Sequence, residues 1–416
     1  MELITEDDVA KKRRIAKKIF EAASEEGIYS ASIHEFYMAR GRGEFAGFTV
    51  PAINLRSMTY DLARAIFRVA NKNDSGVFIF EIARSEIGYT NQPPIEFASM
   101  VIAAAIKEHY SGPVFIQGDH FQANAAKYKE NPNKEIEGLQ ALSVDAVNSG
   151  FFNIDIDSST LVDLTKPTLK EQQLLNYEVC AKLTQFIRHL EPKGITISIG
   201  GEIGEIGHQN STPEDLRVFM GGLKEKLGKG LVGISKISVQ TGTTHGGIVL
   251  PDGSIAQIML DFNTLKTLSE IARREYGLAG AVQHGASTLP PEDFHKFVEY
   301  EAAEVHLATE FQNMIYESKY FPADLKQKIY AWLKVNAANE AKQGETEDQF
   351  LYKTRKKALG PFKKEIMGLP QETRDAIAAE LENKFDFLFK QLNVVNKRDL
   401  LNKYVHAPSS KEKGIP

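Results

Sequence analysis

Three histidines stand where they could share one metal ion, and an aspartate directly precedes the first of them. The histidines are His120, His245 and His284, and the aspartate is Asp119. Each histidine follows a short apolar run typical of a buried strand and opens into a glycine-rich or polar turn. Three imidazoles leave a fourth position on a zinc ion open for a substrate oxygen, and an adjacent carboxylate can transfer a proton. The pattern predicts metal-assisted carbon–carbon bond chemistry next to a carbonyl.

Apolar runs that alternate with amphipathic helical segments predict the frame for these residues. We expect strands at Phe48–Ile53, Val77–Ile82, Pro113–Gly118, Phe151–Ile156, Ile195–Gly200, Ile234–Val239, Leu278–Gln283 and Ala302–Leu307. Runs that are apolar throughout suit a parallel sheet buried on both faces. Eight such repeats predict an α/β TIM barrel, whose active site lies at the carboxyl ends of the strands. A doubly wound open sheet is the alternative, but no GxGxxG motif follows the first strand.

The predicted barrel occupies only the middle of the chain. We expect an N-terminal helical segment over residues 1–46, a catalytic barrel over 47–310, a C-terminal helical extension over 311–405 and a disordered tail over 406–416. The extension is expected to pack on the barrel or on a neighbouring subunit. A homo-oligomer, either dimer or tetramer, is therefore expected.

Composition narrows the class of protein. The net charge of −5 argues against a nucleic-acid partner, and 42% hydrophobic residues are ordinary for a globular chain. No stretch is long and apolar enough to predict a membrane span. The single cysteine, Cys180, suits a reducing compartment, so a cytoplasmic location is expected.

Short motifs in a fixed order resemble the class II, zinc-dependent aldolases of fructose 1,6-bisphosphate and tagatose 1,6-bisphosphate. The motifs are Val50–Asn54, Gly118–His120, Ile156–Ser159, Glu202–Gly204, Thr244–Gly246, His284–Ser287 and Leu307–Glu310. Each one is weak, but seven in the same order are specific. The resemblance covers about residues 45–315.

The resemblance implies a role for each site residue. His120, His245 and His284 would ligate zinc, and Glu202 would orient a ligand or offer an alternative metal position. Zinc would polarise the carbonyl of a ketose or ketose phosphate, and Asp119 would exchange a proton with its C4 hydroxyl. Cobalt, manganese or nickel would also suit these ligands, and a monovalent cation is a further expected cofactor. The residues expected to bind substrate are Asn54, Asp157, Gly246, Gly285, Ser287, His306, Thr309 and Arg355.

Two of these residues have a plainer interpretation. Asp157 could cap the turn that follows it, and Arg355, among three lysines, could lie on a solvated helix face.

The sequence departs from the family pattern near the expected active site. The loop after Glu202 lacks the family's acid that protonates the three-carbon fragment, unless Glu205 or His208 replaces it. His306 replaces an asparagine, and the end of the second strand, Phe80–Ser85, differs from the family, which tends to have glutamine and serine there. An enzyme that breaks the C3–C4 bond and remakes it would not need that acid. A ketose 4-epimerase, acting on free or phosphorylated fructose or tagatose, is therefore the alternative to an aldolase. A non-catalytic scaffold is a third interpretation, and the clustered histidines argue against it.

Overall fold

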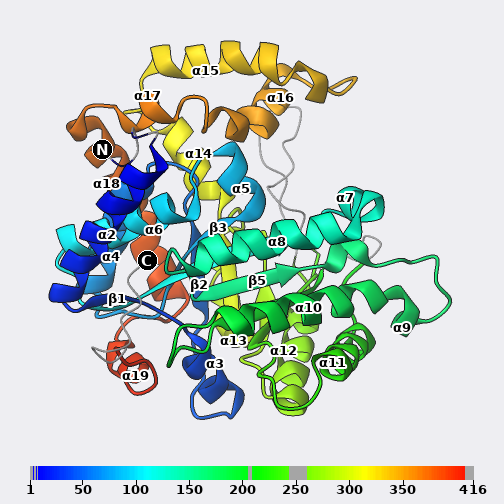
Figure 1. The fold of residues 1–416 in the computed structure, drawn as a ribbon. Helices are drawn as coiled ribbons and strands as arrows, with labels where there is room; N and C mark the ends of the chain where they lie inside the picture. Colours follow the sequence, from blue (N-terminus) through cyan, green and yellow to red (C-terminus); the bar gives the residue numbers. More distant parts are fainter. Residues whose placement is uncertain (1–2, 4–5, 7, 205–208, 243–259, 408–416) are drawn as a thin grey trace.

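The parallel sheet of the protein closes on itself as a barrel (Figure 1). The computed structural model describes residues 3, 6, 8–204, 209–242 and 260–407. Within these residues the strands are β1 (Ile28–Ala31), β2 (Val50–Asn54), β3 (Ile79–Ala83), β4 (Gly112–Gln122), β5 (Asn153–Asp157), β6 (Ser198–Gly204), β7 (Lys236–Val239), β8 (Ala281–Gln283) and β9 (Glu304–Leu307). Strands β2 to β9 form the ring, which closes where β4 pairs with β5. The TIM barrel expected from the sequence is confirmed.

Helices surround the ring, as the intervening amphipathic segments predict. They are α4 (Thr59–Lys72), α5 (Arg84–Tyr89), α6 (Pro94–Lys107), α7 (Ala125–Glu130), α8 (Pro132–Val147), α9 (Leu169–Gln172), α10 (Leu174–Leu190), α11 (Pro213–Leu227), α12 (Phe262–Tyr276), α13 (Lys296–Glu299) and α14 (Thr309–Glu317). Local signals define their ends. At the start of α11, for example, the Thr212 hydroxyl accepts from the Asp215 amide while the Asp215 carboxylate accepts from Thr212.

The sequence analysis expected the N-terminal segment to be helical, but the segment also contains a strand. It contains α2 (Val9–Glu25), strand β1 and α3 (His34–Gly41). Strand β1 pairs with the first half of β4, from Gly112 to Phe115, while the second half of β4 pairs with β5. Four residues are too few to show a clear apolar period, which explains why this strand was missed.

The C-terminal extension packs on its own barrel. It contains α15 (Ala323–Asn336), α16 (Glu347–Thr354), the 3-10 helix η4 (Arg355–Ala358), α17 (Lys363–Met367), α18 (Gln371–Gln391) and α19 (Arg398–Asn402). Helix α18 lies against α4, where buried Arg374 and Asp61 form an ion pair of 3.0 Å. Figure 1 shows α15, α16 and α17 as a layer at the top of the view, beyond α5 and α14.

No helix among the described residues is long and apolar enough to cross a membrane. Nearly all of the predicted tail, from residue 408 on, lies outside the described residues.

Candidate active site

Irregular pairing at the end of β4 places Asp119 and His120 side by side at the rim of the barrel. The register between β4 and β5 shifts between Gly118 and Phe121, so two residues of β4 stand opposite one of β5. His120 has a positive φ of 39°, which turns the chain sharply there. A side chain at Gly118 would meet the ring of Phe121 at 2.4 Å, so glycine is required for this bend.

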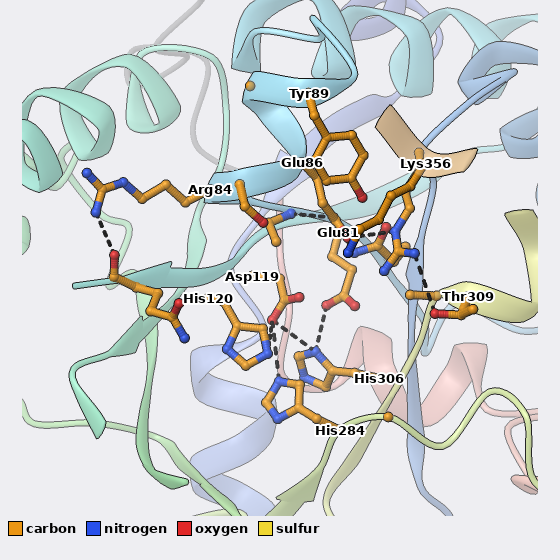
Figure 2. Close-up of a pocket in the computed structure, with 18 of the residues that line it drawn as sticks. Glu81, Arg84, Glu86, Tyr89, Asp119, His120, His284, His306, Thr309 and Lys356 are labelled. Atoms are coloured by element: carbon orange, nitrogen blue, oxygen red, sulfur yellow. Dashed lines mark hydrogen bonds and ion pairs between the residues drawn. The ribbon is translucent and has the colours of Figure 1, made fainter. Parts of the chain in front are cut away.

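The carboxylate of Asp119 lies among three imidazole rings (Figure 2). Its Oδ1 is 3.4 Å from Nε2 of His284, 3.3 Å from Nδ1 of His306 and 3.8 Å from Nε2 of His120. The ring centroids of His120 and His284 are 4.2 Å apart, and those of His284 and His306 are 4.0 Å apart. Burial opposes the charge on Asp119, but the neighbouring His120 and His306 hold its pKa well below the usual value. The carboxylate is therefore ionised and can accept a proton.

Asp119, His120 and His284 have the donor chemistry and spacing of a metal site. One possible ligand atom from each lies within 4.8 Å of the others. Burial, and the neighbouring His306 and His120, keep the pKa of His284 well below its ordinary value, so its ring is neutral and can donate a lone pair to a metal. The residues present therefore fit a divalent ion. His245, the expected third histidine ligand, lies outside the described residues.

Glu202 and Asp157 both contact His120. Nδ1 of His120 is 3.1 Å from Oε2 of Glu202 and 3.2 Å from Oδ2 of Asp157. Burial, and then the charge of Asp157, raises the pKa of Glu202 to about 7. Asp157 also accepts from the amide and the hydroxyl of Ser159, at 3.1 and 2.7 Å. Asp157 thus contacts a candidate ligand and also caps the next turn.

The side chains of Asp119, His120 and His284 open onto a pocket of about 570 Å³, whose lining does not include Asp157 or Glu202. Of the residues proposed from the sequence, the pocket is lined by Asn54, Asp119, His120, His284, Gly285, Ser287, His306 and Thr309. Asn54 donates to Oε2 of Glu86 at 2.7 Å, while its own Oδ1 is buried without a hydrogen-bond partner among the described residues. That oxygen is free to accept from a substrate hydroxyl. Gly246 lies outside the described residues.

Arg355 does not line this pocket. Its guanidinium binds Oε1 of Glu317 at 3.1 Å and the side chain of Asn313, away from the site. The next residue, Lys356, does line the pocket, together with Arg56, Arg84 and Lys127. Arg56 and Arg84 are paired with Glu86 and Glu135. The sequence analysis did not identify these cations, because only the fold brings them from separate segments to one opening.

A charged network below the pocket was also not foreseen. Nζ of Lys236 is 3.0 Å from Oδ2 of Asp155 and contacts Glu304, inside the barrel. Gly200 leaves room for it, since a side chain there would meet Asp155 at 2.3 Å. A charged residue within each of three apolar strands was the signal that could have revealed this network.

Comparison with known proteins agrees with the motifs. The family profile described as fructose-bisphosphate aldolase class-II matches residues 42–390. The fructose-bisphosphate aldolase of Campylobacter jejuni is similar in structure, with 20% identity, a TM-score of 0.51 and coverage of 89% of this chain and 96% of that one. A probable tagatose 6 phosphate kinase from Sinorhizobium meliloti 1021 has 16% identity, a TM-score of 0.56 and coverage of 86% and 99%. At these identities the two structures support the barrel fold alone, and no curated protein matches the chain. Because the profile spans most of its length, the chain belongs to the class II fructose-bisphosphate aldolase family.

Proposed function

We propose that this protein is a metal-dependent aldolase that breaks or forms the C3–C4 bond of a ketose or ketose phosphate. The observation that carries the proposal is the ionised Asp119 beside the paired rings of His120 and His284, in a pocket of a class II aldolase chain. A divalent ion held by His120, His284 and His245 would supply Lewis-acid polarisation of the ketose carbonyl. Zinc is the metal we expect, because imidazole nitrogens suit it.

Asp119 would take the proton from the C4 hydroxyl when the bond breaks and return it when the bond forms. Its low pKa keeps it in the basic form at neutral pH. Asn54 would accept a hydrogen bond from a substrate hydroxyl through its unpartnered Oδ1. Together these contacts would align the bond that breaks with the base.

We infer that an anionic end of the substrate lies near Gly285, Ser287 and Thr309. Thr309 is the first residue of α14, so the partial positive charge of this helix terminus faces the pocket. Arg56 donates to the Thr309 hydroxyl at 3.4 Å, and Lys356 lies on the same pocket. This concentration of donors and cations supports a phosphorylated ketose as substrate.

A product assay tests the function. The protein would be loaded with zinc and incubated with fructose, tagatose and their phosphates, while triose and C4 epimer are both followed. We expect triose products and their loss after treatment with a chelator. The comparisons do not favour the 4-epimerase, since the matching profile is that of an aldolase. An epimer without free triose would nevertheless establish the epimerase. If neither triose nor epimer forms, both functions are refuted.

The oligomer, the absence of nucleic-acid and membrane partners, and the cytoplasmic location stay predictions from composition and sequence.

A further inference from the structure

One buried carboxylate of the pocket, that of Glu86, has no role in the mechanism proposed above. Glu86 lies in the first turn of α5 and is 4% exposed. Its Oε2 accepts from the backbone N–H of Ala83, the residue before that helix, at 2.8 Å. A carboxylate that is hydrogen-bonded to the start of its own helix is held in place by the backbone. Glu86 can therefore fix the orientation of neighbouring side chains.

The first of these side chains is Asn54, at the end of β2. Its Nδ2 donates to Oε2 of Glu86 at 2.7 Å. A carboxylate that is paired with an arginine only accepts hydrogen bonds, so the amide of Asn54 turns its NH₂ group towards Glu86. The other end of the amide, Oδ1, has no partner among the described residues. Glu86 thus determines that Asn54, which lines the pocket, keeps an acceptor and not a donor for a substrate hydroxyl.

The second side chain is Arg56, two residues further along the chain. Its Nε donates to Oε1 of Glu86 at 2.7 Å, and its Nη1 donates to the hydroxyl of Thr309 at 3.4 Å. Pairing through Nε leaves the remaining N–H groups of the planar guanidinium for other acceptors. Glu86 therefore directs this cation to the start of α14, where we infer that the anionic end of the substrate lies.

Glu86 itself has no room for a ligand. Burial, and then the charge of Glu86, raises the pKa of Tyr89, whose hydroxyl stays protonated and hydrogen-bonds to this carboxylate. With Ala83, Asn54 and Arg56, this makes four donors, and a carboxylate offers about four lone-pair positions. Figure 2 shows Glu86 and Tyr89 on the side of the pocket that also holds Lys356. Glu86 can thus act on a substrate only through its neighbours.

We propose that Glu86 is a positioning residue that holds the Asn54 carbonyl for a hydroxyl of the substrate and the Arg56 guanidinium for its phosphate. The proposal rests on the proposed function, because it concerns how a ketose phosphate is recognised in the same pocket. One carboxylate would align the groups that bind two different parts of the substrate. The pocket would then select molecules whose hydroxyl and phosphate have the matching separation.

Steady-state kinetics of Glu86→Gln test this role. Glutamine has nearly the same size, but it carries no charge for Arg56 and can present its own NH₂ group to Asn54. We expect kcat/KM for fructose 1,6-bisphosphate to fall about a hundredfold, because two substrate contacts are misplaced and each contributes about tenfold. An unchanged kcat/KM would overturn the proposal.

A double variant shows whether Glu86 acts through Asn54. Asn54→Ala alone should lower kcat/KM about tenfold. Adding Glu86→Gln to it should cost only about a further tenfold, because the contact that Glu86 supports at Asn54 is already lost. A further hundredfold loss would show that the two residues act independently, against the proposal.

Inorganic phosphate tests the Arg56 contact without the sugar. Calorimetric titration should show about tenfold weaker phosphate binding in Glu86→Gln than in the unaltered protein, and unchanged binding in Asn54→Ala. Equal binding by Glu86→Gln and the unaltered protein, or no binding by the latter, would overturn the proposal.

Glu96→Gln is the matched control for a loss of folding stability. Glu96 is also a buried glutamate in the first turn of a helix, and it pairs with Lys12 and Lys363 outside the pocket. This variant should keep kcat/KM and phosphate affinity whatever its melting temperature. If Glu86→Gln does not fold, Glu86→Asp replaces it, because aspartate keeps the charge but withdraws the carboxylate from its donors. Undiminished kcat/KM and phosphate binding in Glu86→Asp would then overturn the proposal.

These measurements separate the positioning role from the proposed function. Triose formation by the unaltered protein, with an equally active Glu86→Gln, would refute the role of Glu86 and leave the function intact. Weaker phosphate binding in Glu86→Gln, without triose from the unaltered protein, would do the reverse.

Discussion

Asp119 is the residue on which the proposed chemistry most depends, since no other ionised carboxylate among the described residues is in contact with both His284 and His306. We expect Asp119→Asn to lower kcat by roughly 10²- to 10⁴-fold, because the amide keeps the shape but cannot accept the C4 proton. Elemental analysis should still find an ion at His120 and His284. Activity near that of the unaltered protein would show that another group is the base.

Lys356 shows how one residue of the C-terminal extension can take part in the site. It follows α16 in the 3-10 helix η4 and lines the pocket, while Lys357 beside it pairs with Glu340 outside the pocket. We expect Lys356→Ala to raise KM for a phosphorylated ketose about tenfold with little change in kcat, because the variant loses a contact between a charge and the phosphate. A tenfold change corresponds to about 1.4 kcal/mol of binding free energy.

Lys357→Ala is the matched control for this prediction and should leave KM unchanged. Steady-state kinetics with phosphorylated and free sugar separate a lost anion contact from a general defect. An equal change in KM for both sugars would mean that Lys356 does not contact the phosphate.

Strands β5, β7 and β9 each carry a buried charged residue, and these residues form ion pairs inside the barrel. Lys236 is 1% exposed and contacts Asp155 and Glu304, both of which are buried. Removing one partner of a buried ion pair leaves uncompensated charge and typically costs about 3–5 kcal/mol. We therefore expect Lys236→Met to lower the free energy of unfolding by roughly this amount, as measured by urea denaturation.

The exposed Lys224 on α11 provides the control, and Lys224→Met should change the free energy of unfolding by less than about 0.5 kcal/mol. Equal stability of the two variants would show that the network contributes nothing to folding. A double variant, Lys236→Met with Glu304→Gln, should recover part of the lost free energy of unfolding, because it removes one of the two carboxylates left without their cation.

The sequence predicts elements whose pattern is local, and misses contacts that only closure of the barrel creates. All eight barrel strands overlap the predicted apolar runs, because burial on both faces requires such runs, although β6 begins at Ser198 and not at Ile195. Strand β1 is short and follows a glycine, so its period is not readable. Arg355 and Lys356 are adjacent in a basic run, and only the turn of η4 decides that the second one reaches the pocket.

The candidate metal site follows the same division. The sequence predicts that His120 and His284 lie close together, because each is expected at the end of a strand and strand ends meet at one rim. The contacts of His306 with Glu81 and Glu304 could not be predicted from the sequence, because they depend on which strands are neighbours and on the direction of each side chain.

At the scale of the whole molecule, the segments before and after the barrel meet at a second, smaller pocket of about 250 Å³. Residues of β1 and α3, including His34, line it together with Tyr404, Val405 and His406 from the end of the described chain. Figure 1 shows α3 and α19 at the same end of the molecule, opposite the layer of α15 to α17. His34 is 4% exposed, and its Nδ1 has no hydrogen-bond partner among the described residues.

This burial makes His34 a source of acid sensitivity. Burial, and then the charge of Arg188, lowers the pKa of His34 from 6.5 to about 4 in the folded protein. Between these two values the unfolded chain binds a proton that the folded chain does not, so stability is full above about pH 6.5 and falls as the pH drops towards 4. The contribution is on the order of 3 kcal/mol. We expect His34→Gln to flatten the unfolding free energy over this range, as measured by denaturant titration at several pH values. An unchanged slope between pH 6.5 and 4 would mean that His34 is protonated in the folded state as readily as in the unfolded one.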